Sequence, residues 1–204
     1  MQQIDLFPAL STDIPIEYHP NFLTTREADW LFQHCQQLNW QQNQFEMFGK
    51  PLDLPRLECM YGTGTESYTY SRGKVTIQAH PWTPELYELK LKIEDFCCHK
   101  FDRNKFEIVI GNKYRNGQDS IGWHADKEPS MGKKPAIASI SLGASRKFSI
   151  RSKVKGSKPT HYQLEHGSLL IMLPGCQEEF VHEIPKDPKV LTERINLTFR
   201  PYYA

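Results

Sequence analysis

The chain has 204 residues, of which 39% are hydrophobic and 24% are charged, and its net charge is +1. This composition excludes a disordered or fibrous protein, and the near-neutral charge predicts no particular partner. The apolar runs are far too short to cross a bilayer, and the N-terminus lacks the features of a signal peptide. The five cysteines form no C-x-x-C pair, which favours reduced thiols in the cytosol.

A first helix is predicted at residues 24–39. Thr24 and Glu27 fit a capping box, in which each side chain accepts a hydrogen bond from the other residue's backbone. One face of this helix is apolar, as is typical of a helix that packs on a core. That face carries Ala28, Leu31, Phe32, Cys35 and Leu38.

A second helix is predicted at residues 83–100, with Thr83 as its cap and a proline in its first turn. Cys97 and Cys98 at its end are interpreted as core packing rather than chemistry. The Pro- and Gly-rich segment between the helices, residues 45–82, is expected to supply functional loops. The inward face of the second helix is predicted to carry Leu86, Leu89, Ile93, Phe96 and Cys97.

After Phe101 the pattern changes to short β-branched and aromatic runs separated by turn residues. Such regular spacing favours a sandwich or a jelly-roll barrel. We therefore predict an α+β fold that is mainly β, with N-terminal helices packed against a double-sheet barrel. The predicted strands are 105–114, 136–143, 146–152, 161–165, 167–173, 178–184 and 194–202.

The stretch from Pro129 to Leu164 contains no acidic residue. It is interpreted either as a solvated basic face or as a surface that contacts phosphates, because clustered cations release counterions from nucleic acid. Its basic residues are Lys133, Lys134, Arg146, Lys147, Arg151, Lys153, Lys155 and Lys158.

His124 and Asp126 are two positions apart, so on an extended segment their side chains lie on the same face. His182, on a predicted late strand, is the best candidate for a third ligand. Two histidines and one carboxylate with open positions form the facial triad of non-haem Fe(II) oxygenases. The alternative is that the H-x-D pattern arose by chance in a chain with eight histidines.

The final predicted strand alternates apolar residues with polar ones that include Arg194 and Arg200. Arginines that face the inside of a barrel are costly unless they meet an anion, and a dicarboxylic co-substrate would supply it. Asn112 and Tyr114 repeat the two-residue spacing and can bind a carboxylate or a keto group. The alternative is that the polar face of the final strand is solvated and that Asn112 and Tyr114 are ordinary polar residues at the end of a strand.

These segments, N-x-Y-x-x-G, G-x-H-x-D, HGSLL and R-x-N-x-T-F-R, resemble the AlkB family of Fe(II)- and 2-oxoglutarate-dependent nucleic-acid dealkylases from about Pro55 to Arg200. The resemblance implies a single domain, 1–204, with a double-stranded β-helix (jelly-roll) catalytic core at 102–204. Residues 1–101 would hold the helices, the hairpin loops and a nucleotide-recognition lid at 45–82. The implied roles are iron binding by His124, Asp126 and His182, and 2-oxoglutarate binding by Asn112, Tyr114, Arg194, Asn196, Thr198 and Arg200.

The resemblance also implies substrate contacts. Residues 55–73, PRLECMYGTGTESYTYSRG, resemble the region that grips the target base, and without the resemblance this tyrosine-rich run would predict a plain hairpin. Glu128 resembles the acidic residue that reads the amino edge of an alkylated adenine or cytosine; the alternative is a surface carboxylate near Lys127. The implied substrate contacts are Arg56, Tyr68, Tyr70, Ser71 and Glu128.

Residues 44–56, QFEMFGKPLDLPR, resemble the hairpin that the duplex-preferring branch of the family inserts into the base stack. Met47, Phe48 and Gly49 would be its tip, although the two large side chains could also be core residues of a loop. The tract HADKEP looks more like the bacterial branch, so the preference between duplex and single strand stays open.

The activity implied is oxidative demethylation of 1-methyladenine and 3-methylcytosine in DNA. Fe(II), O2 and 2-oxoglutarate would be used, and formaldehyde, succinate and CO2 released. The expected partner is alkylated DNA, without membrane association. We expect a monomer, in the cytoplasm at the nucleoid if bacterial or in the nucleus if eukaryotic. The alternatives are RNA or protein as substrate, a zinc hydrolase on the same ligands, or a nucleic-acid-binding module without catalysis.

Overall fold

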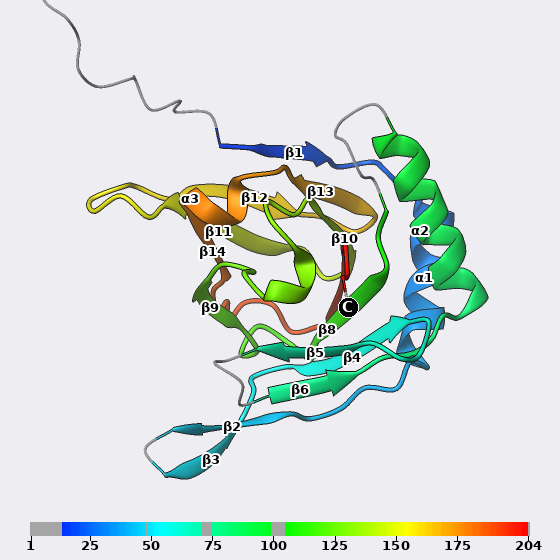
Figure 1. Cartoon of the computed structure of the whole chain (residues 1–204), viewed down its shortest axis with the longest axis horizontal. Coiled ribbons are helices and arrows are strands. Elements are labelled where there is room, and N and C mark those ends of the chain that lie inside the picture. Colours follow the sequence, from blue (N-terminus) through cyan, green and yellow to red (C-terminus); the bar gives the residue numbers. More distant parts are fainter. Residues whose placement is uncertain (1–13, 48, 71–74, 99–104, 204) are drawn as a thin grey trace, which may run out of the picture.

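The computed structural model describes residues 14–47, 49–70, 75–98 and 105–203. Two facing β-sheets form the body, with two long helices on one side (Figure 1). The helices are α1 (Thr25–Gln36), α2 (Pro84–Cys97) and the short α3 (Cys176–Glu179), with a 3-10 turn at Pro129–Met131.

The larger sheet has the strand order β1-β13-β10-β15-β8-β4-β7, and its neighbours pair antiparallel except β4 with β7. The smaller sheet has the order β12-β11-β14-β9 and is antiparallel. This double-sheet arrangement is the predicted jelly roll. The larger sheet is built from β1 (Ile16–His19), β4 (Leu57–Gly62), β7 (His80–Pro81), β8 (Ile108–Tyr114), β10 (Ile137–Gly143), β13 (Ser168–Met172) and β15 (Arg194–Arg200). The smaller sheet is built from β9 (Ile121–His124), β11 (Arg146–Ser152), β12 (Thr160–Leu164) and β14 (Phe180–Ile184).

Two hydrophobic clusters stabilise the body. One joins the larger sheet to the two long helices and includes Leu31, Ile93 and Leu197. The other fills the space between the two sheets and includes Ile110 and Phe148. Because side chains alternate along a strand, β15 buries its apolar residues against the helices and directs its arginines toward the space between the sheets.

Two hairpins lie outside these sheets. β2 (Gln44–Met47) pairs with β3 (Lys50–Asp53), and β5 (Ser67–Tyr70) pairs with β6 (Val75–Gln78). The β2–β3 hairpin projects away from the body at the lower left of Figure 1. Its turn contains Gly49 with φ +74°, a left-handed conformation that favours glycine. The hairpin predicted at 44–56 is therefore present, although Phe48 lies outside the described residues.

The predicted helices are confirmed with shorter ends. Thr24 and Glu27 form the expected reciprocal capping box, and Thr83 caps α2. The prediction that Phe96 lies on the inward face of α2 is wrong. Its exposed fraction is 38%, and its ring makes edge contacts with the rings of His19 and Phe22.

Two further predictions are corrected. Cys98 is exposed, so only Cys97 of that pair packs in the core. Glu178 and Glu179 begin no strand and lie in α3, whose first-turn carboxylates are favourable near a helix N-terminus. All seven predicted strands of the C-terminal half otherwise appear within two or three residues of their expected bounds.

The basic stretch is also divided by the structure. Arg146 is 1% exposed and donates to three backbone carbonyls, so it is a buried structural residue and not part of a basic surface. The seven other basic residues of the stretch are exposed. Within the described ranges, no helix combines the length and apolarity needed to cross a membrane.

Candidate active site

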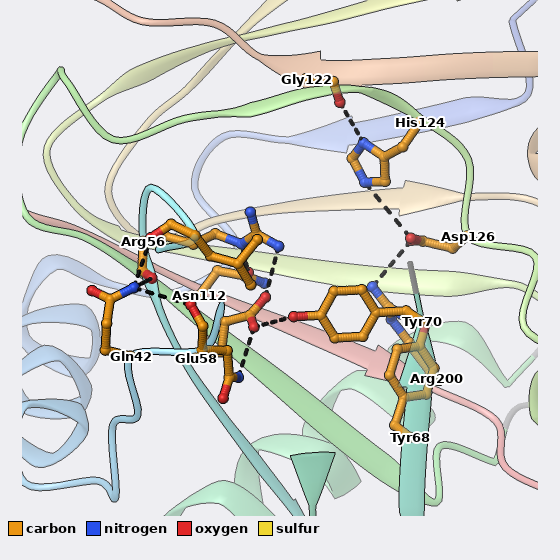
Figure 2. A network of polar contacts seen from close by, with 12 residues as sticks. Gln42, Arg56, Glu58, Tyr68, Tyr70, Asn112, Gly122, His124, Asp126 and Arg200 are labelled. Atoms are coloured by element: carbon orange, nitrogen blue, oxygen red, sulfur yellow. Dashed lines mark hydrogen bonds and ion pairs between the residues drawn. The ribbon is translucent and has the colours of Figure 1, made fainter. Parts of the chain in front are cut away.

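The three predicted metal ligands converge at the inner edge of the smaller sheet. His124 at the end of β9 and His182 in β14 are register partners, and their ring centroids are 4.3 Å apart. Asp126 follows His124 on an extended segment, and candidate ligand atoms of all three residues lie within 4.8 Å of one another. Gly122 O lies 2.8 Å from Nδ1 of His124, so Nδ1–H can donate to it and leave Nε2 as the ligand atom (Figure 2).

The electrostatics of these residues suit a divalent cation. Burial and the neighbouring His124 lower the pKa of His182 to about 3, so its imidazole is neutral at pH 7. Burial acts to raise the pKa of Asp126, but Arg200 and the two histidines outweigh it and hold that pKa below its ordinary value. Two histidines and one carboxylate are the donor set of a non-haem Fe(II) site.

Gln177 holds the backbone of the Asp126 segment. Its Oε1 accepts from the Asp126 N–H at 2.9 Å, and its Nε2 donates to the sulfur of Met172 at 3.1 Å. Gln177 is 3% exposed and lies on α3, directly before the strand that carries His182. Such contacts orient metal ligands in other proteins. The residue was missed from sequence because it lies 51 positions from Asp126.

Arg194 is a buried cation with unused donors. It is 1% exposed, its Nη2 donates to Ser141 Oγ at 2.9 Å, and its Nε and Nη1 have no hydrogen-bond partner among the described residues. Burial lowers its pKa to about 10. A carboxylate beside this guanidinium would supply an acceptor that these nitrogens lack. Arg194 does not itself line the cavity described below, but its guanidinium lies 5.3 Å from the ring centroid of Tyr114, which does.

Arg200 is more fully engaged. Its Nη2 lies 3.1 Å from Asp126 Oδ2, its Nη1 donates to the Tyr68 hydroxyl, and its Nε has no partner among the described residues. This ion pair joins a predicted 2-oxoglutarate contact to a predicted metal ligand, and nothing in the sequence pattern indicated it. The N–H on Nε remains for a carboxylate.

One cavity connects these groups between the two sheets. Asn196 is fixed in its wall by donation to Ser139 Oγ at 2.8 Å, and Asn112 accepts from Arg56 at 2.7 Å. The cavity is lined by Arg56, Glu58, Tyr68, Tyr70, Ile110, Asn112, Tyr114, Ile121, His124, Asp126, Glu128, Ser139, Phe148, Leu164, Leu170, Met172, His182, Ile184, Asn196, Thr198 and Arg200. Metal ligands, carboxylate-binding groups and aromatic rings thus share one enclosed space, as an oxygenase that takes two organic substrates requires.

The comparisons with known proteins agree with this site. The family model described as 2OG-Fe(II) oxygenase superfamily matches residues 15–200. Mouse DNA oxidative demethylase ALKBH2 is 35% identical over 185 residues, which cover 85% of this chain and 74% of that protein. The chain belongs to the AlkB family of 2OG-Fe(II) oxygenases.

A second relative and a solved structure extend the comparison. Human alpha-ketoglutarate-dependent dioxygenase alkB homolog 3 is 38% identical over 195 residues, which are 91% of this chain and 65% of that protein. The chain therefore spans slightly less than two thirds of that relative. The structure of OsALKBH1 superposes with a TM-score of 0.61 at 20% identity, covering 96% of this chain and 100% of the other. This likeness confirms the predicted jelly-roll fold.

Among the predicted substrate contacts of this AlkB-family chain, four lie together in the cavity wall. Glu128 is partly buried and lines the cavity, and its Oε2 is buried with no hydrogen-bond partner among the described residues, which favours the predicted substrate contact over a surface carboxylate near Lys127. Tyr68 and Tyr70 lie with ring centroids 6.0 Å apart, and Arg56 is 5% exposed.

The remaining predicted substrate contact and the predicted hairpin tip are described only in part. Ser71 and Phe48 lie outside them, Met47 ends β2, and Gly49 forms the exposed turn. Glu58 also lines the cavity, although the sequence did not indicate it. The sequence shows a glutamate within a strand but does not show whether its carboxylate is buried or exposed.

Proposed function

We propose that this AlkB-family protein is an Fe(II)- and 2-oxoglutarate-dependent dioxygenase that demethylates 1-methyladenine and 3-methylcytosine in DNA. The observation that carries the proposal is the convergence of His124, Asp126 and His182 on a cavity that Glu128 also lines, with one carboxylate oxygen buried and without a hydrogen-bond partner among the described residues. The mouse relative is a DNA oxidative demethylase, which supports the same activity.

The metal and co-substrate have fitting residues. His124, Asp126 and His182 would hold Fe(II), and Arg194, Arg200, Asn112 and Tyr114 would hold 2-oxoglutarate, with Asn196 and Thr198 completing the pocket. When bound, these groups couple the oxidation of 2-oxoglutarate by O2, to succinate and CO2, to hydroxylation of the methyl carbon. The two unpaired donors of Arg194 support an anion at this position, because a buried guanidinium left without acceptors is costly.

The protein's own residues would select and hold the lesion. Both target bases are cations when methylated, so an acidic side chain at Glu128 in the cavity wall would favour them over neutral bases. The rings of Tyr68 and Tyr70 offer a surface on which a flipped base can stack. The hydroxymethyl product would then lose formaldehyde by cleavage of its C–N bond, and the base would regain its neutral form.

The β2–β3 hairpin is the proposed finger that enters the base stack, with Met47, Phe48 and Gly49 at its tip. Its projection from the body supports this role (Figure 1). The seven exposed cations between Pro129 and Leu164 would contact phosphates. We further propose one domain over 1–204, a monomer, and location at the nucleoid in a bacterium or in the nucleus in a eukaryote.

Mass spectrometry of methylated oligonucleotides tests the proposal. Single-stranded and paired DNA and matched RNA, each with one 1-methyladenine or 3-methylcytosine, are incubated with the protein, Fe(II), 2-oxoglutarate and air. We expect the mass of the methylated DNA to fall by one methylene group, with an equal amount of succinate formed. The His124→Ala variant should leave the mass of the methylated DNA unchanged. Turnover of RNA alone would reassign the substrate. Conversion without oxygen or 2-oxoglutarate would indicate a hydrolase, and an unchanged methylated strand would overturn the proposal.

A further inference from the structure

Glu58 is a buried carboxylate in the cavity wall for which the proposed function has no role. It lies on β4, is 2% exposed, and lines the same cavity as the metal-ligand residues. A buried charge is costly unless it is paired and hydrogen-bonded, so the contacts of Glu58 indicate what it does.

Both oxygens of Glu58 are used, and each connects to a different part of the substrate side (Figure 2). Oε1 accepts from Arg56 Nη2 at 2.7 Å. Oε2 accepts from the Tyr70 hydroxyl on β5 and from Asn43 Nδ2 at 2.9 Å. Asn43 directly precedes β2, the first strand of the projecting hairpin.

The contacts continue beyond Glu58. Arg56 donates through Nε to Asn112 Oδ1 at 2.7 Å, and Asn112 is one of the residues placed at the 2-oxoglutarate pocket. One carboxylate therefore links the root of the hairpin, a tyrosine of the lid and the wall of the co-substrate pocket. Burial and the negative charge of Glu58 raise the pKa of Tyr70, so its phenol stays protonated and keeps donating.

We propose that Glu58 is a positioning residue for the methylated base, which fixes Tyr70 and Arg56 in the cavity wall and thereby sets the preference for methylated over unmethylated strands. The inference rests on the proposed function. A tyrosine held at its hydroxyl presents its ring in one orientation, and a fixed ring loses less freedom when a base stacks on it. Without Glu58, the Tyr70 hydroxyl loses its acceptor and the Arg56 charge loses its counter-ion.

The test compares the binding of two oligonucleotides of one sequence, one carrying a 1-methyladenine. Fluorescence anisotropy is measured without oxygen, with 2-oxoglutarate and with Mn(II) in place of Fe(II). We expect Glu58→Ala to lower the preference for the methylated strand by roughly tenfold, since one base–aromatic stack contributes about that or more. Turnover should show the loss mainly as a raised KM for the oligonucleotide. The affinity for Mn(II) should stay within about twofold, because the hydrogen bonds of the Glu58 carboxylate among the described residues go to Asn43, Arg56 and Tyr70 and not to a metal-ligand residue.

Glu66 provides the matched control. It is also a buried carboxylate, on the connection between β4 and β5, but the hydrogen bonds of its oxygens within the described chain come from the turn residues Thr63, Gly64 and Thr65. Glu66→Gln should keep the preference for the methylated strand. Glu58→Gln should rescue part of it, because the amide keeps one acceptor oxygen for Arg56.

If Glu58→Ala fails to fold, Glu58→Gln and Tyr70→Phe form a second test. Tyr70→Phe keeps the ring and removes its bond to Glu58, so the two substitutions together should cost little more than either alone. Additive losses, or a Glu58 variant with an unchanged preference, would overturn the inference and leave the proposed function standing. A wild-type protein that binds both strands equally and demethylates neither would instead overturn the proposed function.

Discussion

Replacing Arg194 by methionine should change the stability of the free protein and its affinity for 2-oxoglutarate in opposite directions. The fold lowers the pKa of this guanidinium to about 10, which corresponds to a cost of about 3 kcal/mol for keeping it charged at neutral pH. Methionine has a similar length and no charge, and it loses the bond to Ser141 and the cation–π contact with Tyr114, a loss of about 1–2 kcal/mol. The free energy of unfolding of the ligand-free variant should therefore be about 1–2 kcal/mol higher than that of the ligand-free wild type.

The same substitution removes the two guanidinium nitrogens, Nε and Nη1, that have no acceptor among the described residues. Charge-assisted bonds contribute about 1.5–3 kcal/mol each, so the affinity for 2-oxoglutarate should fall by about a hundredfold or more.

Thermal unfolding with Mn(II), with and without 2-oxoglutarate, measures both effects. The melting temperature of the ligand-free variant should rise by about 2–6 °C, and the further rise that 2-oxoglutarate gives the wild type should disappear. Ser157→Ala, at an exposed hydroxyl remote from the cavity lining, is a control that should keep the response to 2-oxoglutarate. A variant that melts lower and still responds to 2-oxoglutarate would refute the reasoning.

Four further outcomes are expected. His124→Ala and Asp126→Ala should abolish demethylation and metal binding with an unchanged circular dichroism spectrum; an active, iron-saturated variant would contradict the ligand assignment. Gln177→Leu should weaken Mn(II) binding by about 10–100-fold in a titration, whereas Gln163→Leu, at an exposed glutamine, should not; equal affinities would exclude a positioning role. The pKa of His182 is lowered to about 3 in the folded, metal-free protein. Below pH 6.5 the unfolded chain therefore binds a proton at His182, whereas the folded chain binds it only near pH 3. The free energy of unfolding should therefore fall as the pH drops from 6.5 toward 3, by up to about 1.4 kcal/mol per pH unit, and His182→Gln should flatten this slope in urea titrations; parallel slopes would refute it. Phe48→Ala should reduce activity on duplex DNA more than on single strands, and equal losses would remove the proposed finger.

Much of the fold followed from local patterns in the chain. The capping box at Thr24 and the alternation along residues 194–200 depend only on neighbouring residues, so both could be predicted. The edge strand β1 was missed, because Ile16 and Tyr18 alternate with polar residues over only four positions, which is at the short limit of a recognisable strand pattern. The exposure of Phe96 was also missed, since the helical period says which residues share a face but not how far the neighbouring segments cover it.

The chain by itself determined the types and spacing of the candidate metal and carboxylate-binding residues, because these follow from residue chemistry and the two-residue repeat of a strand. Only the tertiary structure decided which buried groups meet. Arg200 reaches Asp126 across 74 positions and Tyr68 across 132, and Gln177 reaches the Asp126 backbone across 51. The contact of Arg56 with Asn112 and those of Glu58 with Tyr70 and Asn43 likewise depend on the register of β4 against β8 and on the placement of the two hairpins. Strand register and sheet packing set such distances, and no local pattern contains them.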